Sequence, residues 1–136
     1  MYKTILIPID PAHSGKGEAM INVARSIGGD DAEILLLSVV EGVPSYIAAQ
    51  IPREVIDKSK ENAALVLEGM AKAAGLKARA EVRLGQSYPV ILGVADEIGA
   101  DLIIVASHRP GLQDYFLGST AARVVRHANC SVLVVR

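Results

Sequence analysis

Short apolar segments, spaced along the chain with helical patterns between them, constrain the fold more than any other feature. Four of them, at 4–9 (TILIPI), 33–40 (EILLLSVV), 101–106 (DLIIVA) and 131–135 (SVLVV), are apolar along most of their length. A strand that is apolar on both faces is typical of a parallel sheet that helices cover on both sides. A fifth segment, 77–84 (KARAEVRL), alternates polar and apolar residues and predicts an edge strand with one solvated face.

Helical periodicity fills the segments between these strands and predicts four helices, over 15–27, 53–74, 87–98 and 118–127. Ser14 and Ser87 are the expected caps of the first and third helices, and Gly75 is expected to end the second. The expected apolar stripe of the second helix consists of Val55, Ile56, Ala63, Val66, Leu67 and Met70.

The alternation of strands and helices predicts a single α/β domain that spans residues 1–136. Right-handed crossovers place such strands in one five-stranded parallel sheet with helices on both faces, and the order that we expect is 3-2-1-4-5. In an open sheet of this kind, ligands bind beyond the carboxyl ends of the strands, at the switch point where the crossovers diverge. Here the switch point lies between the first and fourth strands.

Composition excludes several classes of function. The 136 residues include 14 basic and 15 acidic side chains, a net charge of −1, which argues against a nucleic-acid binder with a broad basic surface. The one cysteine, Cys130, excludes an internal disulfide and a cysteine-based zinc cage, and we expect it to be buried at the start of the last strand. The longest apolar run (ILLLSVV) is too short for membrane insertion and no signal peptide is expected, so the sequence predicts a soluble, cytoplasmic protein.

The strongest chemical feature is the triplet Gly118-Ser119-Thr120 at the start of the last predicted helix. A helix N-terminus offers N–H groups and the positive end of the helix dipole to an anion, and glycine lets a phosphate approach the backbone. The alternative is that the triplet only caps the helix. We favour a phosphate site because the expected fold places the triplet at the switch point.

Three further candidates follow strands at the same edge of the sheet. Asp10 either starts a turn before Pro11, or accepts a hydrogen bond from a ribose hydroxyl or holds a metal ion near phosphates. His108 and Arg109 either contact phosphate or are solvated loop charges. The segment 41–52 is long for a loop in a compact domain, and such loops often cover binding sites. No Gly-Lys-Ser/Thr phosphate loop, Gly-x-Ser-x-Gly elbow or other catalytic set is recognised.

Four segments carry a more specific pattern: TILIPID at 4–10, LLLSVVE at 35–41, ADLIIVASHR at 100–109 and LGSTAARVVRHANCSVLVVR at 117–136. In this order they resemble the universal stress protein family, and the end of the chain is most similar to its F/G-type bacterial members. The resemblance covers the whole chain. It implies a Rossmann-like fold of the adenine nucleotide alpha hydrolase class.

The nucleotide-binding signature of that family is Gly, two residues, Gly, nine residues, Gly and then Ser or Thr. The matching positions here are Ala106, Arg109, Gly118 and Ser119, so two glycines are replaced and the second interval is one residue shorter. The F/G-type members look similar in this respect, and the resemblance implies that nucleotide binding survives the change. We hypothesise that Arg109 supplies positive charge where backbone amides are lost.

The resemblance also implies a nucleotide site, position by position. Asp10 would contact the ribose or a metal-bound phosphate, and the backbone of Val39 would meet the adenine. The positions that match the family's site are Pro8, Ile9, Asp10, Val39, Ala106, Ser107, His108, Arg109, Gly118, Ser119, Thr120 and Ala121.

These features together predict a homodimer that binds ATP, or ADP or AMP, with or without Mg²⁺, and acts as a stress sensor or regulator in the cytoplasm. The resemblance implies that the strand at 131–136 pairs with its copy across a two-fold axis, which would also protect an apolar edge. Turnover is expected to be at most slow ATP hydrolysis or autophosphorylation. The alternatives are a protein-interaction module without nucleotide, an adenine-nucleotide hydrolase or transferase that uses Asp10 and His108, and a soluble regulatory subunit of a membrane transporter.

Overall fold

Parallel pairing joins five strands into one sheet in the order β3-β2-β1-β4-β5, as predicted. The computed structural model describes residues 1–41, 50–75, 77–107 and 117–136. The strands are β1 (Thr4–Pro8), β2 (Glu33–Val40), β3 (Ala78–Leu84), β4 (Leu102–Ala106) and β5 (Ser131–Val135). The predicted segments agree with these strands to within one residue at each end, and the alternating segment is an edge strand.

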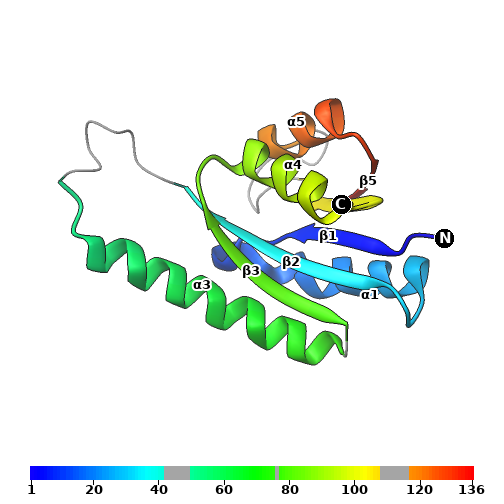
Figure 1. Cartoon of the computed structure of the whole chain (residues 1–136), viewed down its shortest axis with the longest axis horizontal. Coiled ribbons are helices and arrows are strands. Elements are labelled where there is room, and N and C mark those ends of the chain that lie inside the picture. Colours follow the sequence, from blue (N-terminus) through cyan, green and yellow to red (C-terminus); the bar gives the residue numbers. More distant parts are fainter. Residues whose placement is uncertain (42–49, 76, 108–116) are drawn as a thin grey trace.

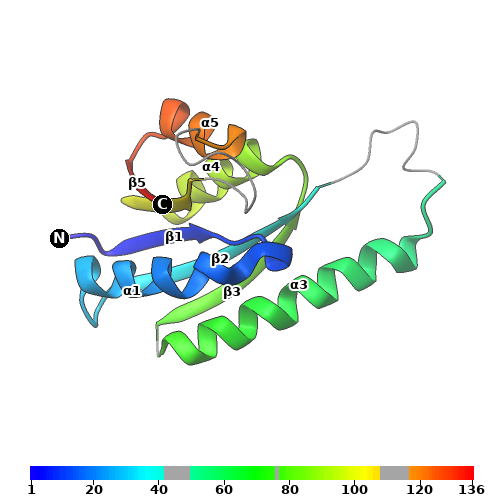
Figure 2. The ribbon, with the colours of Figure 1, turned by 180° about the vertical axis from the view of Figure 1, so that it is seen from behind.

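Helices cover both faces of the sheet. On one face lie α1 (Gly17–Gly28) and α3 (Arg53–Ala74), and on the other lie α4 (Ser87–Ile98) and α5 (Ser119–His127), as Figures 1 and 2 show from opposite sides. A short 3-10 helix, η1 (Pro11–Lys16), connects β1 to α1. This is the doubly wound arrangement that the alternation of elements predicts. In the described parts of the chain, no helix combines the length and apolarity that a membrane span needs.

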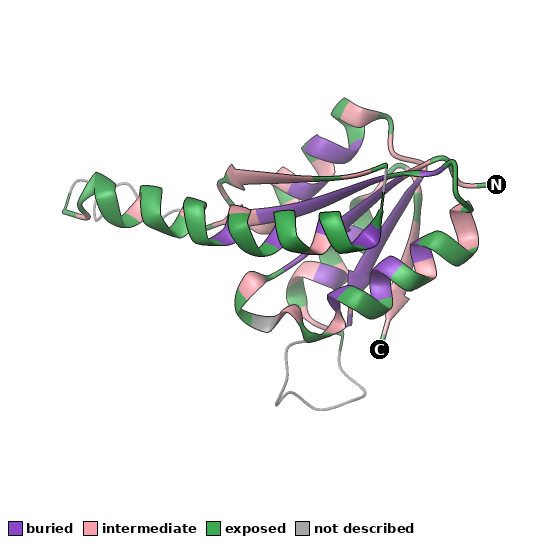
Figure 3. Cartoon of the chain, turned by 90° about the horizontal axis from the view of Figure 1, so that it is seen from below, coloured by how far each residue is buried: buried purple, intermediate pink, exposed green. Residues whose placement is uncertain are grey.

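Alternate residues of the central strands fill two apolar cores, one on each face of the sheet. Ile5 and Ile7 of β1 pack with α1 and α3, whereas Leu6 packs with α4 and α5. All three side chains are 0% exposed, and the central strands form the buried interior in Figure 3. Burying one such side chain stabilises a fold by about 1.5–3 kcal/mol. Because both faces of β1 are covered, its sequence is a continuous apolar run.

Two predicted helix caps are wrong. The helix α1 begins at Gly17 and not directly after Ser14, because η1 precedes it. Asp10 caps η1 instead, since its Oδ1 accepts a hydrogen bond from the Ala12 amide at 3.0 Å. Ser87 is the first residue of α4 and not its cap, and its hydroxyl is bonded to a side chain outside that helix.

The predicted apolar stripe of α3 is only partly buried. The buried residues of this helix are Ala63, Leu67, Ala71 and Ala74. Val55 and Val66 are 54% and 38% exposed, so the prediction is wrong at these two positions. Val55 lies in the first turns of α3, which extend beyond the sheet (Figure 3), and Val66 lies beside the buried line of the helix. Periodicity indicates which face of a helix is apolar, but not how far the sheet beneath it reaches.

Candidate functional site

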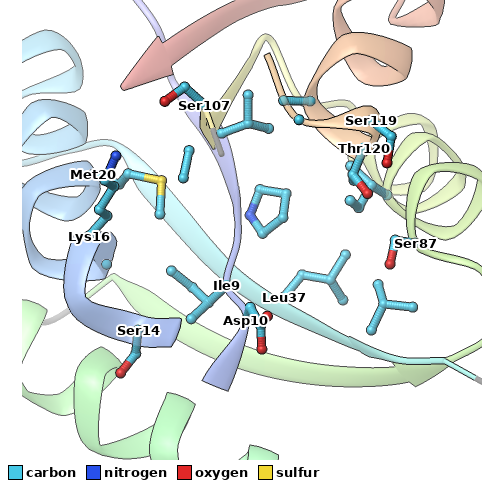
Figure 4. A pocket seen from close by; sticks show the side chains of 18 of the residues that line it. Ile9, Asp10, Ser14, Lys16, Met20, Leu37, Ser87, Ser107, Ser119 and Thr120 are labelled. Atoms are coloured by element: carbon cyan, nitrogen blue, oxygen red, sulfur yellow. The ribbon is translucent and has the colours of Figure 1, made fainter. Parts of the chain in front are cut away.

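A cavity of about 750 Å³ opens at the carboxyl ends of β1, β2 and β4, at the predicted switch point. Figure 4 shows side chains from η1 and α1 on one side of it and side chains from α4 and α5 on the other. Most of the predicted site residues line this cavity. They are Pro8, Ile9, Asp10, Val39, Ala106, Ser107, Gly118, Ser119, Thr120 and Ala121. His108, Arg109 and most of the predicted loop at 41–52 lie outside the described residues.

The end of β2 directs part of its backbone toward the cavity. The Leu37 carbonyl accepts a hydrogen bond from the Ile9 amide at 2.7 Å, where β1 leaves the sheet. On the opposite side of the strand, the Val40 carbonyl accepts from the Gly85 amide at 3.1 Å. Because successive residues of a strand direct their backbone groups to opposite sides, Val39 directs both its N–H and its C=O to the side that β1 has left. One donor and one acceptor therefore lie next to each other at the cavity.

The first turn of α5 offers backbone donors to the same cavity. Gly118 precedes the helix with extended backbone, and its amide donates to the Ser107 carbonyl at 2.5 Å. The first bond of the helix runs from the Ala122 amide to the Gly118 carbonyl at 2.9 Å, so the amides of residues 119–121 come before it. Gly118 thus anchors the turn to the end of β4, and the next three amides are the ones that an anion can reach.

Charged side chains in the described lining are Asp10, Lys16 and Glu41. Asp10 both caps η1 and lines the cavity, so the turn role and the proposed site role are compatible. In the described part of the chain, no group of three or more His, Cys, Asp or Glu side chains is arranged to hold a metal ion. A metal ion at Asp10 would therefore take most of its other ligands from a bound molecule, and its presence stays a prediction.

Sequence reasoning missed Lys16, which ends η1 and lines the cavity from the side opposite α5 (Figure 4). Within the described residues it forms no ion pair. The next residue, Gly17, is packed so closely that a Cβ there would overlap the terminal methyl of Met70 on α3. This contact brings the start of α1, and with it Lys16, next to α3. The signal that could have revealed Lys16 is the Gly-Lys-Gly sequence at 15–17, between the first strand and the first helix.

A second feature missed in the sequence is a hydrogen bond at the cavity rim. Glu41 follows β2 and Ser87 begins α4, and the Ser87 hydroxyl donates to Glu41 Oε1 at 2.7 Å. Both residues line the cavity. Because they are 46 residues apart in the chain, no local pattern could pair them. The bond connects the carboxyl end of β2 to the N-terminus of α4.

Comparison with known proteins gives one consistent family. A model of the universal stress protein family matches residues 1–136. The chain is 32% identical over 142 residues to universal stress protein G of Escherichia coli O157:H7, and the match covers 100% of both proteins. It is also 32% identical over 138 residues to a universal stress protein of Thermus aquaticus, again with 100% of both proteins covered.

Solved structures share the fold. The hypothetical protein MJ0577 is 28% identical, with a TM-score of 0.84 over 99% of this chain and 96% of that one. A universal stress protein in complex with cAMP is 20% identical, with a TM-score of 0.72 over 99% and 97% of the two chains. A universal stress family protein of Arabidopsis thaliana with AMP bound is 18% identical, with a TM-score of 0.64 over 98% and 90%. At such low identity, the last two structures show only that the fold is shared.

Proposed function

The chain belongs to the universal stress protein family, and we propose that it binds an adenine nucleotide in the cavity at the switch point. The observation that carries the proposal is that one cavity presents both the paired N–H and C=O of Val39 and the first-turn amides of α5. Structures of family members with AMP or cAMP support the ligand class. ATP, ADP and AMP are the candidate ligands for this chain.

The base would lie against the end of β2. Adenine carries an amine donor and a ring-nitrogen acceptor on adjacent atoms of one edge. The C=O and N–H of Val39 form the complementary pair, directed to the side that β1 has left. Leu37 and Ile91 also line the cavity and are almost fully buried, so the wall behind this position is apolar, which suits a flat aromatic ring.

The ribose and phosphates would lie toward Asp10 and α5. Asp10 accepts a hydrogen bond from a ribose hydroxyl, or binds Mg²⁺ together with a phosphate. The phosphates would accept hydrogen bonds from the amides of residues 119–121 and from the hydroxyls of Ser119 and Thr120, at the positive end of the helix dipole. Lys16 adds a positive charge from the η1 side. Arg109 stays a predicted phosphate contact, to be tested by the affinity of Arg109→Ala.

Such a site suits a sensor or regulator of the cytoplasm that changes state with nucleotide occupancy. Slow ATP hydrolysis or autophosphorylation is the most turnover that we expect. We also propose a homodimer through β5, because this edge strand consists mainly of half-buried apolar residues and, in the part of the chain that the structure describes, its outer backbone edge pairs with no other strand. An apolar edge of this kind is an aggregation risk unless it is covered.

Calorimetric titration with ATP, ADP and AMP, each with and without Mg²⁺, tests the proposed function. We expect saturable binding of at least one of these nucleotides. Absence of binding at millimolar ligand would contradict the proposal and favour an interaction module without nucleotide.

The phosphate position is tested by Ser119→Asp. An acidic residue in the first turn of a helix is favoured by the helix dipole, so the fold should be retained, but its charge repels phosphate. We expect ATP affinity to fall by about tenfold or more while adenosine affinity is unchanged. The matched control is Ser26→Asp, which adds the same charge at an exposed position of α1. Equal effects of the two variants would place the phosphates elsewhere.

A further inference from the structure

The cavity lining separates into an apolar part and a polar part. Leu37, Val39 and Glu41 all line the cavity, because alternate side chains of an extended strand share a face. Leu37 and Val39 pack in the same apolar cluster as Ile91 of α4, which also lines the cavity. Val39 is half-buried and the other two side chains are almost fully buried, so together they make this part of the lining apolar, and Glu41 follows at the end of β2.

The Glu41 carboxylate has a defined orientation. The Ser87 hydroxyl donates to its Oε1 at 2.7 Å, and among the described residues this is its one hydrogen bond. The second carboxylate oxygen is therefore available to a ligand. An ionised carboxylate only accepts hydrogen bonds, so the ligand atom that it meets is a donor or a cation. The carboxylate repels a phosphate, so the phosphates would lie at the α5 end of the cavity and the base beside this apolar part of the lining.

Val39 and Glu41 would then meet the same exocyclic amine of the base. The amide and the carbonyl of Val39 face the same side of β2, and the carbonyl is the one nearer to Glu41 along the chain. An exocyclic amine has two N–H groups, of which the Val39 carbonyl can accept one. The other N–H is left for the carboxylate.

We propose that Glu41, positioned by Ser87, accepts a hydrogen bond from the exocyclic amine of the base and selects 6-aminopurine nucleotides over their 6-oxo counterparts. This inference rests on the proposed function. A 6-oxopurine presents a carbonyl oxygen at the same place, which the carboxylate repels and which leaves both acceptors without a donor. Ser87 is a positioning residue, because it acts on the base through Glu41.

Titration of ATP and ITP into the wild type and variants tests the inference. ITP differs from ATP in carrying oxygen in place of the amine. In Glu41→Ala we expect ATP affinity to fall about tenfold, as for a lost hydrogen bond to a charged group, while ITP affinity stays the same or rises because a repulsive contact is removed. Ser87→Ala should reduce the ATP preference several-fold, and Ser87→Thr, which keeps a hydroxyl, should restore it. The control is Glu33→Ala, which removes an exposed carboxylate at the opposite end of β2.

The outcomes separate this inference from the proposed function. Equal changes in the affinity for ATP and ITP in Glu41→Ala would overturn the inference, because the carboxylate would then not distinguish the two bases. Tighter binding of GTP than ATP by the wild type would also overturn it, since guanine offers its own N–H donors to a carboxylate. If the wild type binds none of these nucleotides, the proposed function itself fails. Circular dichroism of each variant checks that the fold is retained.

Discussion

Lys16 is the residue whose charge should decide how strongly the cavity prefers polyphosphates. It lines the cavity and forms no ion pair in the described part of the chain. In Lys16→Gln we expect ATP affinity to fall about tenfold, because a charge-assisted contact is lost, and AMP affinity to fall less. Calorimetric titration measures both. Lys3→Gln removes the same charge from an exposed position just before β1, at the end of the strand opposite to the cavity. This control variant should change neither affinity. A uniform loss for ATP and AMP would contradict a polyphosphate contact.

Cys130 should react slowly with alkylating reagents. Partial burial raises the pKa of this thiol, and the carboxylates of Asp101 and Asp96 raise it further because they disfavour a thiolate. Since the thiolate is the reactive form, the alkylation rate by iodoacetamide should reach its midpoint at a higher pH than that of a free thiol. Asp96→Asn should move the midpoint to lower pH. A midpoint at or below that of free cysteine would show that burial and the two carboxylates do not raise the pKa of this thiol. The prediction of a buried Cys130 at the start of the last strand is confirmed only in part, because the residue is half-buried and directly precedes β5.

At the scale of elements, the turn from β3 to α4 depends on Gly85. Its φ of +142° lies in a region that other residues rarely adopt, and a Cβ there would lie 2.7 Å from Val90 Cγ2. Gly85→Ala should therefore lower the free energy of unfolding by about 1–3 kcal/mol. Gly93→Ala is the matched control, since no atom lies within 4 Å of a Cβ at that exposed position of α4. We expect it to raise stability by up to about 1 kcal/mol, as alanine favours helix over glycine. Urea denaturation measures both, and similar losses in the two variants would contradict the role of the turn.

The whole molecule should assemble into a dimer through the outer edge of β5. The Val135 carbonyl accepts from the Ser107 amide at 2.9 Å, so this residue faces β4 and Val134 directs its backbone to the open edge. Light scattering of the wild type should give twice the chain mass of 14.3 kDa. Val134→Pro removes the outer N–H, which an edge strand tolerates, and should give the single-chain mass. Val134→Thr keeps the N–H and should remain a dimer. A dimeric Val134→Pro, or a monomeric wild type, would contradict assembly through this edge.

The sequence by itself determined the strands, the helices and the order of the sheet. Periodicity and burial on two faces are local properties that each segment carries in its own residues, and the right-handedness of crossovers leaves few ways to arrange them. The general position of the cavity followed, because the switch point is a consequence of that order. The glycine that ends the helix α3 was likewise predictable, since its role depends only on its neighbours in the chain.

Only the tertiary structure decided which side chains meet at the cavity and which remain exposed. Lys16 reaches it because η1 precedes α1 where Gly17 packs against α3, and Glu41 meets Ser87 across 46 residues of sequence. Val55 is exposed because α3 extends beyond the sheet. The physical reason is the same in each case. Such contacts depend on where two separate elements lie in space. The residue pattern of one element contains no information on the position of the other.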